Sequence, residues 1–396
     1  MRGLLVAACA SVTVLLAGCA HPAAEDPIQP LPPAEGRVNS GLGPEARPLS
    51  SGPGYKGSPS WSLGGDRVAF IVDGYVVDRT VDGEQLTRWT TKDFVAAEAE
   101  WTADGTLTML GGAGAVEGKP GAVYRTDSKE GSLGVEKMAE DVLAMTPGPE
   151  HKDVVLALEA GADESAVALL RAGRMERVYT GTVPGTVTAV SPSPDGDRVA
   201  LAVRTPGESR SGELHVFDLR SGEARKISEL EDDRSILGAP QWTERGIYFV
   251  AGAMSSPADD GEPLYDLYRT EPEPGEPEPA PGVGEDFVAG GARVSPEGDR
   301  LAVVGRLNSK SPLNLYVLNL TTGNFDAVTT NEDMEIKTGA DDLAWSPAGT
   351  SVAIVARGTS SGEPEVRAAP ADELLDAFYN LYEVPITTPE PPEAPR

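Results

Sequence analysis

The sequence predicts an all-β fold made of repeated four-stranded units, and three observations support this prediction. A similar phrase recurs at four separated places: SPSWSLGGDRVAFIV at 58–72, SPSPDGDRVALAV at 191–203, RVSPEGDRLAVV at 293–304 and AWSPAGTSVAIV at 344–355. Each phrase joins residues typical of a tight turn to a β-branched, apolar stretch typical of a buried strand. Helical periodicity is almost absent, with one exception near the C-terminus.

The spacing of the phrase predicts a β-propeller. When the units are aligned on the residue just before the turn, 40 to 52 residues separate consecutive units, which is the range of four-stranded propeller blades. The aligned residues are Trp61, Trp101, Met145, Pro192, Trp242, Val294 and Trp345. Seven units predict a seven-bladed propeller over 46–369. Six blades remain an alternative, because the unit around Met145 resembles the others least.

Further strands follow the phrase in most units. ELHVFDL from Glu213 and NLYVLNL from Asn314 predict a third strand, and ARKISEL from Ala224 and FDAVTT from Phe325 predict an outer strand. The fifth unit also carries EPEPGEPEPAPG at 271–282. This insertion is interpreted as a loop, either a projecting polyproline segment or a segment without a role of its own.

The two ends of the repeat region predict how the ring closes. The last unit offers strands at Leu343–Ser346, at Ser351–Arg357 and near Glu365–Ala368, but no clear fourth strand. ARPLSS at 46–51 lies just before the first unit, where other units place an outer strand. We therefore expect this segment to pair within the last blade, because closure protects the sheet edges of a propeller. Pro48 fits there only if the segment is an edge strand.

One segment near the C-terminus has helical periodicity. In ADELLDAFYNLYEV, one face carries Leu374, Leu375, Phe378, Leu381 and Tyr382. The pattern predicts a short helix over 370–384, capped by Asp372 and docked on the propeller. Its apolar face would cover a sheet edge or, as an alternative, bind a partner.

The N-terminus predicts export and a lipid anchor. Arg2 precedes an apolar run from Leu4 to Leu16, which is too short to span a bilayer and is typical of a signal peptide over 1–18. The sequence Leu-Ala-Gly-Cys ending at Cys19 resembles a bacterial lipobox, so Cys19 is the predicted lipidation site, where a diacylglycerol would hold the chain on the bilayer. The alternative is an ordinary secreted protein.

Two segments with few large apolar residues flank the predicted domain. Residues 19–45 are rich in Pro, Ala and acidic residues and predict a flexible tether, and 385–396 predict a disordered tail. Cys9 would leave with the signal, so the mature chain would have no pair of thiols to form a disulfide. The formal net charge is −29, which makes nucleic-acid binding improbable because phosphate backbones would be repelled.

Motifs with catalytic or metal-binding potential are weak. GTSSG at 358–362 matches the nucleophile elbow of hydrolases at Ser360, but no helix follows it and all three histidines, His21, His151 and His215, lie upstream. A hairpin loop explains its glycines, and each lone histidine is expected at the surface. We therefore predict no catalytic residue, cofactor or zinc site, and no enzymatic activity.

Acidic residues and tryptophans each allow two interpretations. Paired acids occur at 232–233, 259–260 and 341–342, and a calcium loop with Asp259, Asp260, Glu262 and Asp266 competes with a solvated acidic loop, which we favour. The four tryptophans among the aligned residues would fill the same core position in four blades rather than form a sugar platform. Trp89, on an outer strand, is the one expected to be exposed.

The repeated S-P-x-G-x-x-[VL]-A phrase resembles the propeller repeats of TolB and of the actinobacterial lipoprotein LpqB. The residues that carry the resemblance are Ser58-Pro59 through Ala69, Ser193 through Ala200, Ser295 through Ala302 and Ser346 through Ala353. It covers roughly 51–369 and implies a propeller that contacts proteins at the cell envelope. The N-terminal modules of both relatives have no counterpart after Cys19, and TolB lacks a lipobox.

These features favour a non-enzymatic, lipid-anchored propeller that acts as a scaffold or adaptor on the extracytoplasmic face of the cell membrane. Its partners would be the bilayer, through diacylglyceryl-Cys19, and an envelope or membrane protein, with the chain itself a monomer. The composition suits an actinobacterium. The alternatives are a carbohydrate- or solute-binding, or carbohydrate-active, propeller with a ligand in the central channel, and a purely structural surface protein.

Overall fold

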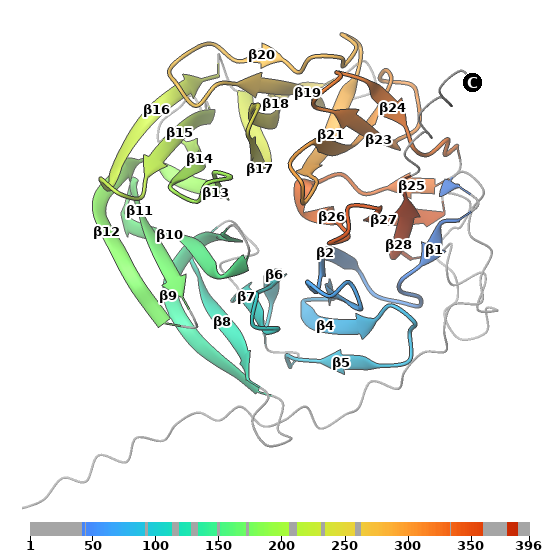
Figure 1. Ribbon diagram of the computed structural model, residues 1–396, viewed down its shortest axis with the longest axis horizontal. Helices are drawn as coiled ribbons and strands as arrows, with labels where there is room; N and C mark the ends of the chain where they lie inside the picture. Colours follow the sequence, from blue (N-terminus) through green and yellow to red (C-terminus); the bar gives the residue numbers. More distant parts are fainter. Residues whose placement is uncertain are drawn as a thin grey trace, which may run out of the picture.

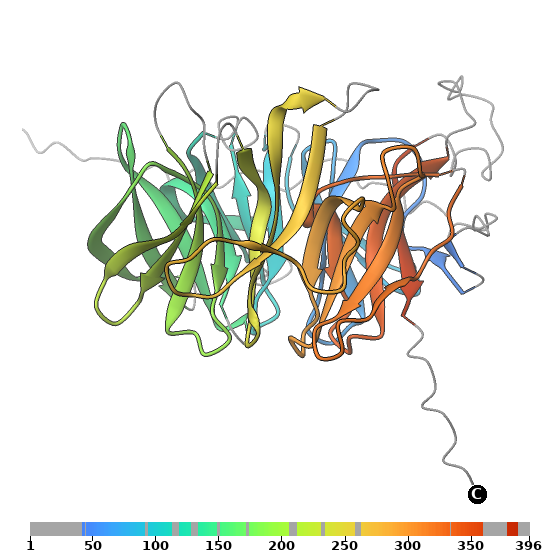
Figure 2. The same cartoon turned by 90° about the horizontal axis from the view of Figure 1, so that it is seen from above.

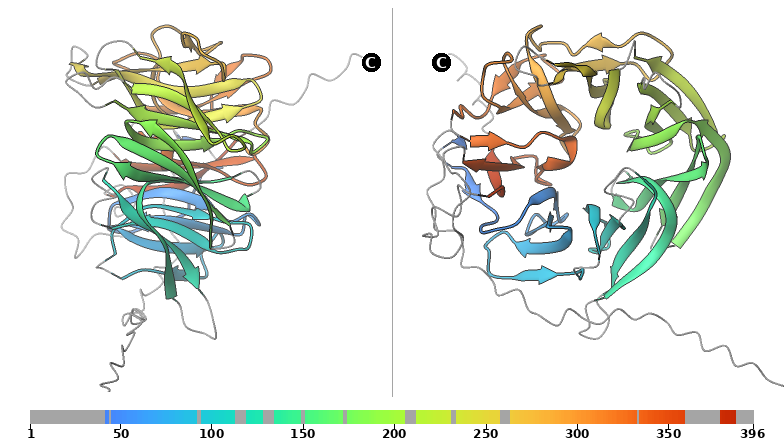
Figure 3. Two further views of the ribbon diagram at one scale, coloured as in Figure 1. Left: turned by 90° about the vertical axis from the view of Figure 1, so that its left-hand side faces the viewer. Right: turned by 180° about the vertical axis from the view of Figure 1, so that it is seen from behind.

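The computed structural model describes residues 42–386, apart from 44, 92–93, 113–118, 128–133, 149–150, 172–173, 206–211, 231–233, 258–262, 333 and 359–377. The described residues form six antiparallel sheets that stand radially around one axis (Figure 1). Seen from the side, the ring is a flattened disc (Figure 2). Two further views show the stacked sheets and the ring from behind (Figure 3). The all-β propeller predicted from the repeats is confirmed.

Four of the sheets have four strands each, in chain order from the axis outward. They are β2 (Lys56–Trp61), β3 (Arg67–Val72), β4 (Tyr75–Thr80) and β5 (Leu86–Arg88); β13 (Thr186–Pro192), β14 (Arg198–Arg204), β15 (Gly212–Asp218) and β16 (Glu223–Glu229); β17 (Arg234–Thr243), β18 (Gly246–Pro257), β19 (Pro263–Thr270) and β20 (Glu278–Pro279); and β21 (Val288–Val294), β22 (Arg300–Arg306), β23 (Asn314–Asn319) and β24 (Phe325–Ala327).

The 271–282 segment contains the last strand of its sheet, β20, and does not project freely. Arg225 Nη2 on the neighbouring strand β16 donates to the Pro272 carbonyl at 3.2 Å, and the Gly275 amide donates to the Ile227 carbonyl at 2.9 Å. Ala280 is buried. The segment thus binds two sheets together.

The fifth sheet has seven strands because one long strand serves two halves of it. The strands are β6 (Ala96–Trp101), β7 (Leu107–Gly111), β8 (Gly121–Asp127), β9 (Gly134–Pro147), β10 (Asp153–Gly161), β11 (Glu164–Arg171) and β12 (Arg174–Pro184). The first part of β9 pairs with β8, and its last part, from Val142 onward, pairs with β10. The strand therefore runs from the rim of the ring toward its centre.

The sixth sheet joins the two ends of the chain. It contains β25 (Met334–Ile336), the 3₁₀ turn η5 (Ala340–Asp342), β26 (Leu343–Trp345), β27 (Ser351–Gly358), β28 (Asn380–Pro385) and β1 (Arg47–Pro48). Arg47 and Pro48 pair with Glu383 and Tyr382. The predicted closure by 46–51 is therefore confirmed, and Pro48 lies on the edge strand, where no ladder donor is needed.

The C-terminal helix prediction is wrong for residues 380–384, which form strand β28. Leu381, Tyr382 and Val384 are buried in this strand, and β28 pairs with β27 on one side and with β1 on the other. The backbone hydrogen bonds that this segment forms with β27 and β1 outweigh its local preference for a helix. Phe378 precedes the strand, whereas Asp372, Leu374 and Leu375 lie outside the described residues. None of the described helices is long and apolar enough to cross a membrane.

The serine of the repeated phrase fixes the turn after the inner strand in four of the units. The Ser193 hydroxyl accepts the amide of Arg198 at 2.9 Å, and Ser295 accepts that of Arg300 at 3.1 Å. In the first unit Ser62 has this role and accepts the Arg67 amide at 3.0 Å. The sequence alignment on Ser58-Pro59 is therefore wrong by four residues, because that pair lies inside β2.

Contacts between neighbouring sheets repeat as well. The guanidinium of Arg198 lies 5.0 Å from the ring centroid of Trp242 on the next sheet, and Arg300 lies 5.1 Å from Trp345. Such cation–π contacts contribute about 0.5–1 kcal/mol at exposed sites and more when they are desolvated. The four aligned tryptophans are only 5% to 7% exposed, which confirms that they fill the core. Trp89 is half-buried and donates to Asp78 Oδ1 at 2.7 Å, so it is not the exposed residue we expected.

The two faces of the ring carry connections of different length. The turns that follow the inner strands are short and lie on one face, which we call the short-turn face: 62–66, 102–106, 193–197, 295–299 and 346–350. The second strands end and the third strands begin at the opposite face, which we call the long-loop face. Between these strands the chain has 9 residues after β7, 7 after β14, 7 after β22 and 21 after β27, but only 2 after β3 and after β10. On this face β18 and β19 extend beyond their neighbours (Figure 2).

Leu381→Ala should strongly destabilise the ring. Leu381 is fully buried and packs with Leu49, Phe70 and Val355, so its truncation opens a cavity at the junction of the first and last sheets. Leu-to-Ala changes in cores cost about 2–5 kcal/mol in unfolding free energy, which urea denaturation can measure. The control Leu307→Ala, at a 58% exposed position, should stay within about 0.5 kcal/mol. Equal stability of the two variants would contradict the closing role of β28.

Candidate functional site

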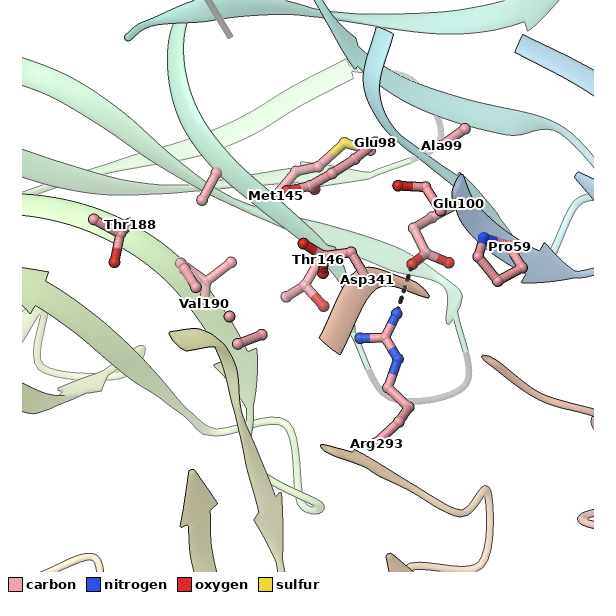
Figure 4. Close-up of a pocket in the computed structure, with 15 residues that line it drawn as sticks. Pro59, Glu98, Ala99, Glu100, Met145, Thr146, Thr188, Val190, Arg293 and Asp341 are labelled. Carbon is pink, nitrogen blue, oxygen red and sulfur yellow. Dashed lines mark hydrogen bonds and ion pairs between the residues drawn. The ribbon is translucent and has the colours of Figure 1, made fainter. Parts of the chain in front are cut away.

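The inner strands surround a small cavity on the axis of the ring. Its volume is about 60 Å³, which is room for about two water molecules at ~30 Å³ each. Its lining comes from β2, β6, β9, β13, β17, β21 and the η5 turn (Figure 4). Most of the lining side chains are small, and the charged ones are Glu98, Glu100, Arg293 and Asp341. We call these four residues the channel cluster.

Irregular pairing in the inner strands creates this lining. Register shifts interrupt β2, β6, β13, β17 and β21 near their midpoints, and such bulges redirect side chains. Glycines allow close approach at this level. A Cβ on Gly238, where φ is +71°, would lie 2.7 Å from the Cβ of Ala340, and one on Gly291 would lie 2.6 Å from the Gly339 carbonyl carbon. The η5 turn therefore packs directly against β17 and β21.

Glu100 and Arg293 form an ion pair within the cavity lining. Arg293 Nη2 donates to Glu100 Oε1 at 3.2 Å, and Ser60 Oγ donates to Glu100 Oε2 at 2.7 Å. The Arg293 carbonyl accepts the indole N–H of Trp345 at 2.8 Å. These contacts join four sheets around one carboxylate. Because both charged groups are largely buried, the pair is screened less by salt than a surface pair.

Glu98 and Asp341 lie beside this ion pair but do not take part in it. Burial is the main cause that raises the pKa of Glu98 well above its ordinary value, and the carboxylates of Asp341 and Glu100 add to the effect. The Arg293 charge and the Met145 amide oppose the rise only in part. The site therefore disfavours the charged form of the Glu98 carboxyl group.

A second ion pair stands where η5 meets the first sheet. Lys337 Nζ lies 3.0 Å from Asp342 Oδ1 and 4.3 Å from the ring centroid of Tyr55, and the Ser58 amide donates to the same Asp342 oxygen at 3.3 Å. Burial raises the pKa of Asp342, while Lys337 lowers it. Of the 341–342 acid pair, Asp342 is buried in this ion pair, whereas Asp341 is exposed and lines the channel cavity.

Other residues considered in the sequence lie apart from the channel. His215 is buried, against expectation, and its Nε2 lies 2.7 Å from Glu213 Oε2, while half-buried His151 contacts the Trp101 carbonyl at 3.0 Å through Nδ1. Asp266 bonds with the Tyr268 hydroxyl at 3.1 Å. Within the described ranges, no three His, Cys, Asp or Glu side chains are placed to hold a metal ion. Cys19, His21, Ser360, Asp232, Asp233, Asp259, Asp260 and Glu262 lie outside those ranges.

Sequence reasoning missed Glu98, Glu100 and Arg293. In the repeat alignment, Glu100 and Arg293 stand one position before Trp101 and Val294, where Ser60, Ser191 and Ala344 occupy other units. A charged residue at a position that is small in several other units is the signal that identifies Glu100 and Arg293. Glu98 and Asp341 lie at other positions of their units and carry no such signal.

Comparisons with known proteins support the fold. No protein-family model matches this sequence, and no curated protein is similar to it in sequence. Among solved structures, the propeller domain of the trilobed protease of Pyrococcus furiosus is 12% identical and matches 85% of this chain and 99% of its own, with a TM-score of 0.52. That domain has an open velcro topology, whereas β1 and β28 pair here.

Two further solved structures have similar scores. Oligogalacturonate lyase of Vibrio parahaemolyticus is 11% identical over 86% of this chain and 93% of its own, with a TM-score of 0.54. The Cps50 (Swd1) propeller domain of Myceliophteria thermophila is 15% identical over 86% and 100%, with a TM-score of 0.53. A candidate TolB of Agrobacterium tumefaciens reaches a TM-score of only 0.45 at 13% identity, with 85% and 93% covered. At these identities the likeness shows a β-propeller fold and nothing about activity.

Glu98→Gln should make the protein more stable at neutral pH. A carboxyl group whose pKa is raised on folding stabilises the fold most below its ordinary pKa of 4.5, and that stability is lost as pH rises through the raised value. Melting temperatures from pH 5 to 8 should fall less for the variant than for the natural chain. Glu140→Gln, at an exposed position where a Lys137 contact lowers the pKa, serves as control. A Glu98→Gln protein that melts lower than the natural chain at pH 7 would refute the assignment.

Proposed function

We propose that this chain is a non-enzymatic, lipid-anchored propeller that binds another envelope protein as a scaffold or adaptor. In this proposal, diacylglyceryl-Cys19 holds the monomer on the extracytoplasmic face of a bacterial, actinobacterial cell membrane. The ring acts as a rigid platform on which loops from several sheets converge. The repeated phrase supports a place among the TolB-like and LpqB-like envelope propellers.

The observation that carries this proposal is the difference between the two faces of the ring. At the long-loop face, the second and third strands of four sheets are separated by 7 to 21 residues of chain, whereas the strands that meet at the short-turn face are separated by two to seven residues. Loops of this kind tolerate sequence change and often carry binding residues. Two exposed apolar side chains, Tyr55 at 60% and Leu307 at 58%, also lie on the long-loop face. We therefore assign partner binding to this face.

We also propose to count the ring as seven blades. β9 serves as the outer strand for β6, β7 and β8 and as the inner strand for β10, β11 and β12. With this count, each of the seven blades contains one of the seven aligned residues. An experimental structure would test the count.

A crosslinking experiment in native membranes tests the adaptor function. The mature chain should recover one membrane protein at near-stoichiometric yield, and Cys19→Ala should lose it because the anchor raises the local concentration of the partner. Leu307→Arg and Tyr55→Arg, both on the long-loop face, should reduce the yield. Leu63→Arg, at a 44% exposed position in a short turn, is the matched control. Equal loss with Leu63→Arg, or no specific protein at all, would refute the proposal.

The channel cluster favours a second candidate, a solute site on the axis. A small cation bound there would favour the charged form of Glu98 and lie among three acidic side chains, but a volume of about 60 Å³ is far below the roughly 300–1,000 Å³ of sites for larger ligands. A sugar ring would require the inner strands to move apart. A thermal-shift screen with methylammonium and with neutral sugars separates the cases. Stabilisation by methylammonium that Glu98→Gln abolishes would support the solute site and weaken the adaptor proposal.

A further inference from the structure

A larger cavity lies at the seam where the ring closes. Its volume is about 280 Å³, and it is enclosed by the first sheet and by the segment that leads from β1 into β2. The residues that line it are Ser50, Ser51, Pro53, Lys56, Phe70, Val72, Asp73, Tyr75, Val77, Arg79, Gly83, Leu86 and Arg88. We call this cavity the seam pocket.

The seam pocket lies beside the short strand that closes the ring. β1 has only two residues, as does the outer strand β20 of another sheet. Phe70, Val77 and half-buried Leu86 line the pocket and belong to the same apolar cluster as Leu381. An apolar, partly open pocket of this kind favours the tail of an amphiphile.

The pocket is rich in positive charge although the chain is strongly acidic. Its lining contains Lys56, Arg79 and Arg88 but only one carboxylate, Asp73, in a chain whose net charge is −29. The Arg88 guanidinium lies 5.4 Å from the ring centroid of Tyr75. A group that enters this pocket therefore meets a local excess of cations, which complements an anionic head group.

Lys56 is a structural tie rather than the binding group. It is 2% exposed, and its Nζ donates to the carbonyls of Gly52 at 2.6 Å, Gly54 at 3.3 Å and Tyr379 at 3.3 Å. Burial lowers the pKa of Lys56 to about 8, with a partial offset from Asp73. These contacts hold the wall of the pocket in place. Because the Lys56 ammonium is already hydrogen-bonded, another cation would bind the anion.

Arg79 is the cation best placed to receive an anion. Its Nη2 donates to the Gly83 carbonyl at 3.2 Å, and within the part of the chain that the structure describes no carboxylate forms an ion pair with it. Burial lowers the pKa of the Arg79 guanidinium, and exposed Asp82 offsets this only in part. A partly desolvated guanidinium without an ion-pair partner is costly, and a planar carboxylate can satisfy it through two parallel hydrogen bonds.

We propose that the seam pocket binds a medium-chain fatty acid, with its carboxylate on Arg79 and its tail against Phe70, Val77 and Leu86. The size of the pocket supports this class of ligand. A cavity of about 150 Å³ accommodates benzene, so a pocket of about 280 Å³ suits roughly twice as many heavy atoms, as in decanoate. The site is separate from the channel and reaches the long-loop face only at one end, near Asp73. Its ligand and its binding residues do not depend on the adaptor proposal.

Isothermal titration with decanoate tests the site on the mature chain. Decanol and decyltrimethylammonium, which have the same tail with a neutral or cationic head, should bind at least about 10-fold more weakly, because a hydrogen bond to a charged group changes affinity about 10- to 100-fold. Arg79→Gln should weaken decanoate binding by a similar factor. Arg79→Lys should lie between the two, since it keeps the charge but loses the paired geometry.

Two further variants control for the fold. Leu86→Trp should fill the pocket and abolish binding, while Arg220→Gln, which removes an exposed arginine paired with Asp197 on another sheet, should bind decanoate like the natural chain. Thermal melting shows which variants are folded. If Arg79→Gln is not folded, Arg79→Lys takes its place as the test variant. The proposal is overturned if decanoate does not bind, if the three head groups bind equally, or if folded Arg79→Gln retains full affinity.

Discussion

The structure depends on one backbone contact, the pairing of β1 with β28. A propeller is a ring of sheets, and each sheet buries its faces only if it has neighbours on both sides. Leu49 donates its amide to the Leu381 carbonyl at 2.8 Å, and Leu381 donates to Ser50 Oγ at 2.8 Å. These bonds connect residues more than 300 positions apart. They turn a linear array of repeats into a closed fold in which the first and last sheets share one apolar cluster.

Closure also determines the geometry on the axis. Because the inner strands converge there, they need small residues and bulges, and Gly238 and Gly291 allow the η5 turn to pack against β17 and β21. Little room is left, so the few charged side chains that face the axis are forced together. The ion pair of Glu100 with Arg293 connects strands of opposite parts of the ring, whereas burial, together with the neighbouring carboxylates, raises the pKa of Glu98. The channel is therefore an electrostatic centre with a very small volume.

The same closure leaves the seam incomplete. The two residues of β1 are enough to pair with Tyr382 and Glu383, but they do not cover the outer strands of the first sheet. The Lys56 ammonium donates to the carbonyls of Gly52 and Tyr379. These hydrogen bonds hold the segment between β1 and β2 beside the pocket. A cavity with an apolar base and basic groups results, in a protein whose surface is otherwise dominated by acidic residues. Binding potential thus concentrates in three places: the axis, the seam and the long-loop face.

The sequence by itself determined the repeat, and with it the fold. Ser193, Arg198 and Trp242 have counterparts in several blades, where the same contacts recur, so the repeat reveals them without a structure. Closure by 46–51 also followed, because a blade without an outer strand requires one. Only the tertiary structure decided that Leu381 and Tyr382 lie in a strand. The helical pattern is a local preference, whereas pairing with β27 and β1 depends on residues far away in the sequence. The tertiary structure also decided that Glu98, Glu100, Arg293 and Asp341 meet on the axis. Residues so far apart in sequence become neighbours only when the ring has closed.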